Sequence, residues 1–568
     1  MKSLNKILIT LLMIGFNACN SPKESADLVL LNGNIITLNN TDSKATAVAV
    51  KSDTIIAVGT DYQIKEFIGE STEIIDLKGK TVIPGFIESH AHLIGLGKSK
   101  INLDLTDTQN WDEVIAKVVA ASENTKPGDW IIGRGWHQEK WNTVPHKTVN
   151  GYPYNTMLNK AVPYNPVMLS HASGHAILVN QKAIDLAEVT DSTKSPEGGN
   201  IVKDENGQII GVFEETAEDL INNKYLQYLS LQNSEQLNRQ TEREIISGVD
   251  ESLKNGITSF HDAGETFAKI DILKKLVDEN KIKIRLYVMV GDTLKNLRKN
   301  LVNYKTIGYG NNFLTIRSIK IYIDGALGSR GAWLLEPYED LQDHRGLTVT
   351  PLSEIREVAE LALTNGYQLC THAIGDRGNR EILDIYEDIF SQNTSINNFR
   401  WRVEHAQHLS TKDILRFSKL GVIPAMQGVH CTSDAPFVIK RLGYKRAEEG
   451  AYVWRKLIDN GAIICNGTDA PVENVSPLQS FYSTVTRQLK SGEIFFKDQK
   501  MTRLEALKSY TINGAYAAFE ENIKGSIEKG KLADFTVLSK DILTIPDKEI
   551  LSTEVLMTIV GGKILFAK

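Results

Sequence analysis

Cysteine, proline and net charge are all scarce in this sequence of 568 residues. If Cys19 carries lipid, the other three of the four cysteines cannot all pair with one another, so a disulfide framework is excluded. None stands in a C-x-x-C motif, and Cys370 and Cys465 lie in short apolar runs, so we expect buried thiols. Fifteen prolines beside 42 glycines exclude a collagen-like or disordered chain. With 64 Lys and Arg against 70 Asp and Glu, no basic excess exists to bind nucleic acid.

Long apolar runs are scarce as well. The run from Ile7 to Phe16 follows two lysines and is too short to span a bilayer, and no other stretch is long and apolar enough. The residues that follow it, up to Cys19, resemble a bacterial lipoprotein cleavage box, with Phe16 where leucine is usual. We therefore predict a signal peptide over 1–18, a linker over 19–26, and lipid on Cys19. The protein would then be exported to the bacterial cell envelope and anchored to a membrane, on its periplasmic or surface side. The alternative is a buried N-terminal helix.

Both ends of the remaining chain are predicted to be rich in β-structure. Short strands with Asn-Gly and Asn-Asn turns are expected within Leu28–Leu38, Ala45–Val58 and Thr81–Ile83, and again within Asp534–Leu538 and Leu556–Phe566. The two ends could pair with each other, as one small composite unit of residues 27–83 and 523–568.

Between these ends, strand patterns alternate with helical patterns, which indicates a parallel sheet. Eight strands are predicted, at Val82–Ile87, Ile257–His261, Ile284–Val290, Ile316–Ile323, Tyr367–His372, Arg400–His405, Gly421–Met426 and Ala462–Gly467. The expected fold class is therefore α/β, with a (β/α)8 TIM barrel over residues 84–522. The first interval is too long for one connection, so we expect an insertion at about 105–232, followed by a charged helix over Ser234–Asn255. A capping box at Thr502–Glu505 predicts a helix through Ala518.

Ionisable residues follow the predicted barrel strands, where catalytic groups of such barrels lie. The first strand ends in His90-Ala91-His92, and residues two apart in an extended segment face the same side. Lys320 alternates with isoleucines on the fourth strand, so its side chain would point into the barrel. An inward lysine must be paired, neutralised or converted to a carbamate that bridges two metals. The alternatives are a salt bridge to Asp324 or an outward-facing side chain.

Three later strands add further candidate ligands. His372, His405 and Asp469 end the fifth, sixth and eighth strands, and each alone has a structural interpretation as a hydrogen-bonded core histidine or an N-cap aspartate. Together, six strand-end residues would supply the nitrogen and oxygen ligands of a two-metal site, namely His90, His92, Lys320, His372, His405 and Asp469.

The order of these six residues resembles the amidohydrolase superfamily, over nearly the whole mature chain. The segments at 83–92, 256–264 and 371–377 look like the branch that includes N-substituted formamide deformylase. The resemblance implies that the two β-rich ends form a small sandwich. It also implies a binuclear centre with a carboxylated Lys320 and with Asp469 as metal ligand and proton shuttle. The long insertion departs from the better-known members, which makes transfer of their substrates unsafe.

The expected function is metal-dependent hydrolysis of a C–N bond, of amide or N-substituted formamide type, in a small-molecule substrate. Two divalent ions, zinc being the expected metal, would share the hydroxide that attacks the carbonyl, and Asp469 would pass a proton to the leaving amine. His175, Arg330 and Trp136 are candidate substrate contacts, each with a structural or solvent-exposed alternative, and the roles of His261 and His430 stay open. Other interpretations are a lipid-anchored binding protein with a vestigial site, or an esterase, lactonase or isomerase on the same fold. A homo-oligomer is left open.

Overall fold

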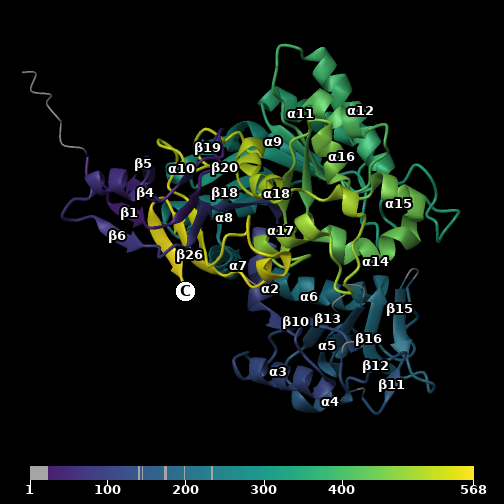
Figure 1. Cartoon of the computed structure of the whole chain (residues 1–568). Helices are drawn as coiled ribbons and strands as arrows, with labels where there is room; N and C mark the ends of the chain where they lie inside the picture. The colour runs from purple at the N-terminus through teal and green to yellow at the C-terminus, as the bar shows by residue number, and fades with distance from the viewer. Residues whose placement is uncertain (1–23, 139–140, 144, 172–175, 197–198, 232–233) are drawn as a thin grey trace, which may run out of the picture.

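The computed structural model describes residues 24–568, apart from 139–140, 144, 172–175, 197–198 and 232–233. The candidate lipidation residue Cys19 lies outside the described residues. Three units can be followed in Figure 1: a central barrel, a β-unit formed by the purple and yellow ends of the chain, and a blue unit beside the barrel. Cys370 and Cys465 are buried free thiols, as predicted, and Cys431 is buried and free as well. None of the described helices has both the length and the apolarity needed to cross a bilayer.

The central unit is a nearly closed parallel barrel, which confirms the predicted fold class. Its strands, in spatial order, are β8 (Phe86–Ala91), β17 (Ile257–Glu265), β18 (Arg285–Val290), β20 (Leu314–Tyr322), β21 (Gln368–Ala373), β22 (Arg402–His405), β23 (Ile423–Gln427) and β24 (Cys465–Gly467). Seven of the eight predicted strands are present near their predicted positions. The bounds predicted for the first, Val82–Ile87, are wrong, because Val82–Pro84 belongs to β7 (Thr81–Pro84), which pairs with the C-terminal end of the chain, and the barrel strand begins at Phe86. The amide of Asp469, just after β24, donates to the carbonyl of His90 on β8 at 2.7 Å, which brings the last strand back to the first.

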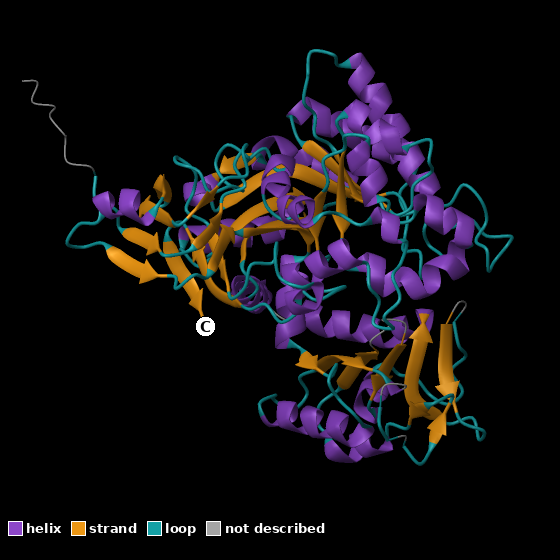
Figure 2. Ribbon diagram, viewed as in Figure 1, coloured by secondary structure: helices purple, strands orange, loops and turns teal. Residues whose placement is uncertain are grey.

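The strands are almost entirely buried because helices cover the outside of the barrel, as orange strands within purple helices show in Figure 2. These helices include α8 (Phe267–Asp278), α9 (Leu294–Tyr304), α11 (Leu352–Asn365), α12 (Asp376–Gln392), α14 (His430–Leu442) and α17 (Pro477–Thr486). Along α12, for example, Ile382, Tyr386 and Ile389 recur at helical spacing and join the main core. The parallel strands therefore all end at one face of the barrel.

The predicted capping box is confirmed, whereas the predicted helix length is wrong. Thr502 accepts the amide of Glu505, and the Glu505 side chain accepts the amide of Thr502. The helix α18 (Arg503–Ser509) then ends, because the backbone of Thr511 leaves the helical region (φ −138°, ψ −99°) before α19 (Ile512–Ala517) begins. The break lets α19 pack tightly on β8, where a Cβ at Gly514 would lie 2.9 Å from Ile87.

The two chain ends pair, as the sequence suggested. One sheet has the order β5 (Thr54–Gly59), β4 (Ala47–Lys51), β1 (Leu28–Leu31), β6 (Glu73–Asp76). The other has the order β27 (Lys563–Ala567), β26 (Val555–Val560), β25 (Phe535–Leu538), β7 (Thr81–Pro84), β2 (Asn34–Ile36), β3 (Lys44–Ala45). The antiparallel pair of β25 and β7 joins the two ends, and one buried cluster contains side chains of both sheets, such as Leu30 and Phe535.

The long interval after β8 holds a separate sheet, as expected of an insertion. Its strands, in spatial order, are β15 (Gly199–Lys203), β16 (Ile209–Glu215), β14 (Ala176–Val179), β13 (Val167–His171), β10 (Ile131–Trp136) and β9 (Leu103–Asp104). It also contains α3 (Trp111–Glu123), α4 (Thr156–Ala161), α5 (Gln181–Leu186) and α6 (Asp219–Leu231). Two helices connect it to the barrel: α2 (Leu93–Ile101), which directly follows the His-x-His segment, and α7 (Ser234–Lys254), which leads into β17.

Candidate metal centre

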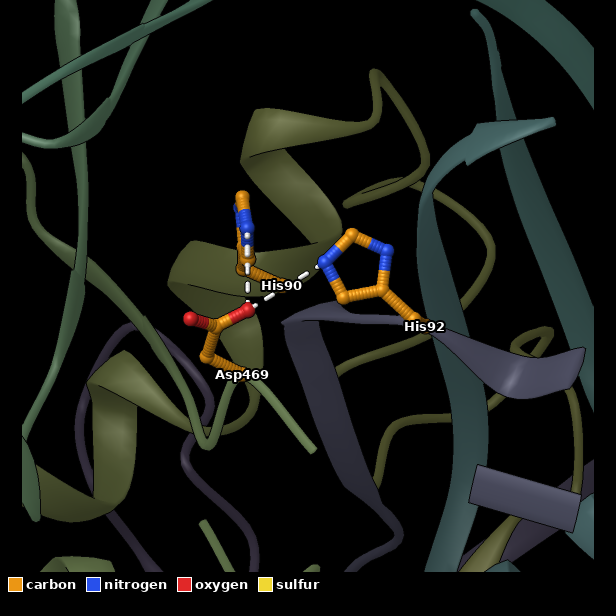
Figure 3. A group of neighbouring side chains, drawn as sticks. All are labelled: His90, His92 and Asp469. Carbon is orange, nitrogen blue, oxygen red and sulfur yellow. Dashed lines mark ion pairs between the residues drawn. The ribbon is translucent and has the colours of Figure 1, made fainter. Parts of the chain in front are cut away.

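The structure brings the six predicted ligands together at the carboxyl ends of the barrel strands. Nε2 of His90 and Nε2 of His92 lie 3.5 and 3.3 Å from Oδ1 of Asp469 (Figure 3). Nζ of Lys320 lies 3.4 Å from Nε2 of His90. The ring of His405 is 4.7 Å from that of His90 and 4.5 Å from that of His372, measured between centroids. Residues almost 400 positions apart in sequence therefore form one cluster.

Lys320 points into the barrel, and the two alternatives for it do not occur. The side chain is buried, with its Nζ near His90 and 4.6 Å from the ring centroid of Tyr322. Among the described residues no carboxylate forms an ion pair with it. Asp324, the alternative partner, instead accepts backbone amides of the neighbouring loops, from Trp333, Ile374 and Gly375 at 2.8–2.9 Å. Burying an ammonium without a carboxylate partner costs free energy, and this cost favours neutralising the lysine or converting it to a carbamate.

The donor set fits divalent cations. Two groups, His90–His92–Asp469 and His405–His430–Asp469, have one ligand atom per residue within 4.8 Å of each other. Nε2 of His372 and of His430 are buried without a hydrogen-bond partner among the described residues. Burial lowers the pKa of His90, His372 and His405 well below the usual range, so these imidazoles are neutral, as metal ligands must be. Neutral imidazoles with a carboxylate suit zinc and similar ions.

Neighbouring side chains fix which ring nitrogen is available. Nδ1 of His90 hydrogen-bonds to Glu404, and Nδ1 of His405 to Oε1 of Gln427 at 2.8 Å. Because these oxygens accept, each proton sits on Nδ1 and each Nε2 keeps its lone pair toward the cluster. Arg402 is fully buried and forms an ion pair with Glu404. Its Nε lies 2.7 Å from Oε1 of Glu404, and its Nη2 donates to Oε2 at 2.9 Å. Neither Glu404 nor Arg402 was predicted from the sequence, although both lie on the strand that ends in His405.

A second buried carboxylate ties β8 to β24. Glu88 accepts the amide of His90 at 3.1 Å, and both the amide and the hydroxyl of Thr468 at 2.8 Å. Burial raises the pKa of Glu88 to about 8, although these hydrogen bonds lower it. A Cβ at Gly467 would lie 2.2 Å from Oε1 of Glu88, so glycine is required for this approach. The glutamate thus joins the His-x-His strand to the loop that carries Asp469.

A cavity of about 560 Å³ opens beside the cluster. Its described lining includes five of the six ligands, together with His430, Gln407, Asp434 and Glu473. The other lining residues are Tyr322, Ala326, Leu327, Gly328, Ser329, Ile374, Phe437 and Val472. Of the predicted ligands only His90 is not part of this lining, because it is fully buried beneath the others. The arrangement therefore offers a small molecule direct access to the ligand cluster.

The candidate substrate contacts have different positions. Trp136 is fully buried in the core of the insertion, where its indole N–H donates to the carbonyl of Leu169 at 2.9 Å, so the structural alternative describes it better. Arg330 pairs with Asp340 at 2.8 Å and is not part of the cavity lining. His175 lies outside the described residues. His261, left open by the sequence, is buried in the barrel with its Nδ1 3.2 Å from Arg402.

A parallel barrel with imidazoles, an aspartate and a buried lysine at its strand ends is the architecture of a metal-dependent hydrolase. The profile of the Amidohydrolase family matches residues 73–566, and the chain belongs to this family of metal-dependent hydrolases.

Several named proteins are similar to this chain over nearly its full length. The chain is 32% identical to Protein LONG AFTER FAR-RED 3 of Arabidopsis thaliana, over 95% of this chain and 92% of that protein. It is 30% identical to the putative amidohydrolase YtcJ of Bacillus subtilis (94% and 98% covered) and 27% identical to N-substituted formamide deformylase of Arthrobacter pascens (95% and 98% covered). An uncharacterized metal-dependent hydrolase from Pyrococcus horikoshii has a similar structure, with a TM-score of 0.73 at 27% identity, covering 92% of this chain and 99% of that one.

Proposed function

We propose that this protein hydrolyses a C–N bond, of amide or N-substituted formamide type, in a small molecule. The observation that carries the proposal is the convergence of His90, His92, Lys320, His372, His405 and Asp469 beside an open cavity. The bond type is suggested by the deformylase of Arthrobacter pascens, which is similar over nearly the full length.

The six residues would hold two divalent cations, with zinc as the expected ion. Bound there, such ions polarise a carbonyl and lower the pKa of water toward neutrality. Lys320 would serve as a carbamate. Its ammonium first loses one proton, and the neutral amine then adds to CO2: an N–C bond forms, a C–O π bond breaks and a second proton is released, so a buried cation becomes an anionic ligand. This conversion removes the cost of an ammonium that has no carboxylate partner.

Asp469 would carry the proton in this reaction. Its Oδ1 faces both histidines of the His-x-His segment, while its Oδ2 lies 3.9 Å from Nε2 of His430. Burial opposes its ionisation, but the hydrogen bond from His92 stabilises the carboxylate, and the pKa of Asp469 lies well below its usual range. A carboxylate at this position would accept the proton of the attacking water and return it to the leaving amine.

The test is Asp469→Asn, assayed on a panel of formamides, amides and esters. Asparagine keeps the shape but cannot carry the proton, so kcat should fall by at least about 100-fold, the scale of a lost general base. The control is Asp388→Asn, a carboxylate that pairs with Arg356 on the surface. A near-normal rate for Asp469→Asn would refute the role of Asp469, and turnover of esters alone would refute the C–N bond.

We also propose that the protein is a lipoprotein of the bacterial cell envelope, attached to a membrane through Cys19. The support is the apolar run and the cleavage box of the first nineteen residues. Detergent, but not high salt, should then release the native protein from membranes. Release by salt would contradict a lipid anchor.

A further inference from the structure

One face of helix α14 forms a wall of the cavity. His430, Asp434 and Phe437 stand at positions i, i+4 and i+7 of this helix, which places them on one side, and all three line the cavity. The loop Ala326–Ser329 forms an adjoining wall. Arg441, also on α14, donates to the carbonyl of Gly328 at 2.9 Å, and a Cβ at Gly328 would lie 3.4 Å from the ring of Phe437. The spacing of the two walls is therefore fixed.

Asp434 is held rigidly and still has one oxygen available. Gln407 Nε2 and the Tyr452 hydroxyl donate to it at 2.6 and 2.5 Å, and both hydrogen bonds fall on Oδ2. Among the described residues, none donates to Oδ1. Burial raises the pKa of Asp434, and the nearby Glu473 raises it further, although His430, Tyr452 and Gln407 lower it. The two hydrogen bonds to Oδ2 determine the orientation of the Asp434 carboxylate, and no described cationic side chain pairs with it.

The charges that line the cavity are unbalanced on this side. Of the described lining residues, Lys320 is the one that carries an ammonium or guanidinium group, and it belongs to the metal centre with Asp469. Asp434 and Glu473 remain without a basic partner in the lining. Beside them, Nε2 of His430 is buried, lacks a hydrogen-bond partner among the described residues and lines the same cavity. A buried polar atom without a partner needs a ligand or water to satisfy it.

From this geometry we infer that α14 forms a subsite for a protonated amine carried by the substrate, with Asp434 as the group that binds it. The inference rests on the proposed function, since it names the substrate class for the same site. His430 lies beside Asp469, and Asp434 lies one helical turn further, a rise of about 5–6 Å. An alkyl chain of roughly four carbons would therefore separate the ammonium from the bond that is cleaved. Phe437 and Val472 would contact the apolar part of that chain.

Two substrates of equal size test the inference: N-(4-aminobutyl)formamide and N-pentylformamide, in which a methyl group replaces the ammonium. We expect the holoenzyme to favour the first by at least about tenfold in kcat/KM, the scale of a charge-assisted hydrogen bond. Asp434→Asn keeps the shape of the side chain and should abolish this preference. The metal content should stay unchanged, and the measured effect is the loss of the ratio between the two kcat/KM values. Ser433→Ala, an exposed neighbour on the same helix, is the control and should keep the preference.

Binding separates failure of the inference from failure of the proposed function. Calorimetry would compare pentylammonium with 1-pentanol on the holoprotein and on Asp434→Asn. If neither formamide is hydrolysed, the proposed bond type fails, while tighter binding of pentylammonium that is lost in Asp434→Asn would still support the subsite. Equal binding of both probes, an ammonium preference that survives in Asp434→Asn, or a preference lost only in Glu473→Gln would each overturn the assignment to Asp434.

Discussion

His408 differs from the histidines of the metal centre, although it lies three residues after His405. Neither of its ring nitrogens has a hydrogen-bond partner among the described residues, and its ring packs edge-on against Tyr452, 5.5 Å between centroids. Burial lowers its pKa from 6.5 to about 3. The folded protein therefore keeps this imidazole neutral at pH values where the unfolded chain takes up a proton.

This difference predicts a loss of stability in acid. Because the pKa of His408 is lower in the folded state, its contribution is complete above pH 6.5 and is lost as the pH falls toward 3. Between pH 7 and pH 5 the loss is about 2 kcal/mol. His408→Phe keeps an aromatic ring beside Tyr452, so its urea midpoint should change less between these pH values than that of the wild type. An equal change in both proteins would contradict this account.

The sequence predicted that the six candidate ligands would lie together, because each lies on a barrel strand or just after one, and parallel strands end at the same face. The strand positions alone therefore brought distant residues together. Glu404 and Asp434 carried no comparable signal. The role of Glu404 depends on a contact with His90 from another strand, and that of Asp434 on which face of α14 meets the cavity. Such contacts depend on how side chains from distant segments pack, and this packing cannot be predicted from a local sequence pattern.

The crossing of α2 and α7 shows how helices position the first two ligands. A Cβ at Gly97 of α2 would lie 1.6 Å from the carbonyl oxygen of Glu244 on α7. A Cβ at Gly248 of α7 would lie 2.5 Å from the carbonyl oxygen of Leu93, the residue after His92. The backbones therefore touch at two glycines, and this contact fixes the start of α2 directly behind the His-x-His segment.

Gly97→Ala should push these helices apart. Since the obstacle is a backbone carbonyl rather than a flexible side chain, we expect a cost of about 1–3 kcal/mol, the range of overpacked sites. The apparent melting temperature should fall by about 1–3 °C, because the entropy of unfolding of so long a chain is large. Ser99→Ala, on the same helix, is the control because its hydroxyl donates to the carbonyl of Leu96 within that helix. An unchanged melting temperature for Gly97→Ala would show that the crossing adapts without cost.

At the level of elements, the sequence predicted regular segments better than their interruptions. The strand predicted over Ala45–Val58 contains a turn, at which Ser52 has a positive φ of 53° and which divides β4 from β5. The predicted helix through Ala518 is likewise broken at Thr511. Ser52 and Thr511 are neither glycine nor proline, so the sequence carries no strong signal for an interruption at either residue. Packing against other parts of the chain determines both, as the contact of Gly514 with β8 illustrates.

Across the whole molecule, one buried ion pair joins the composite β-unit to the barrel. Asp534 accepts hydrogen bonds from Nε and Nη2 of Arg285, on barrel strand β18, at 2.7 and 3.0 Å. It also accepts a hydrogen bond from the amide of Gly561 at 2.8 Å. The bidentate geometry satisfies both charges, which a buried pair requires. Because β25 and β7 pair beside it, the two chain ends and the barrel form one continuous structure.

The central claim is that the protein binds two metal ions at the ends of the barrel strands and that Lys320 is one of their ligands. The most direct measurement is the metal content of purified protein, compared with Lys320→Ala and combined with intact-mass analysis for a labile carbamate. We expect two divalent ions per chain in the wild type, about one or fewer in Lys320→Ala, and an added mass of CO2 only where Lys320 is present. A single ion that is unaffected by Lys320→Ala, or no bound metal, would contradict the account.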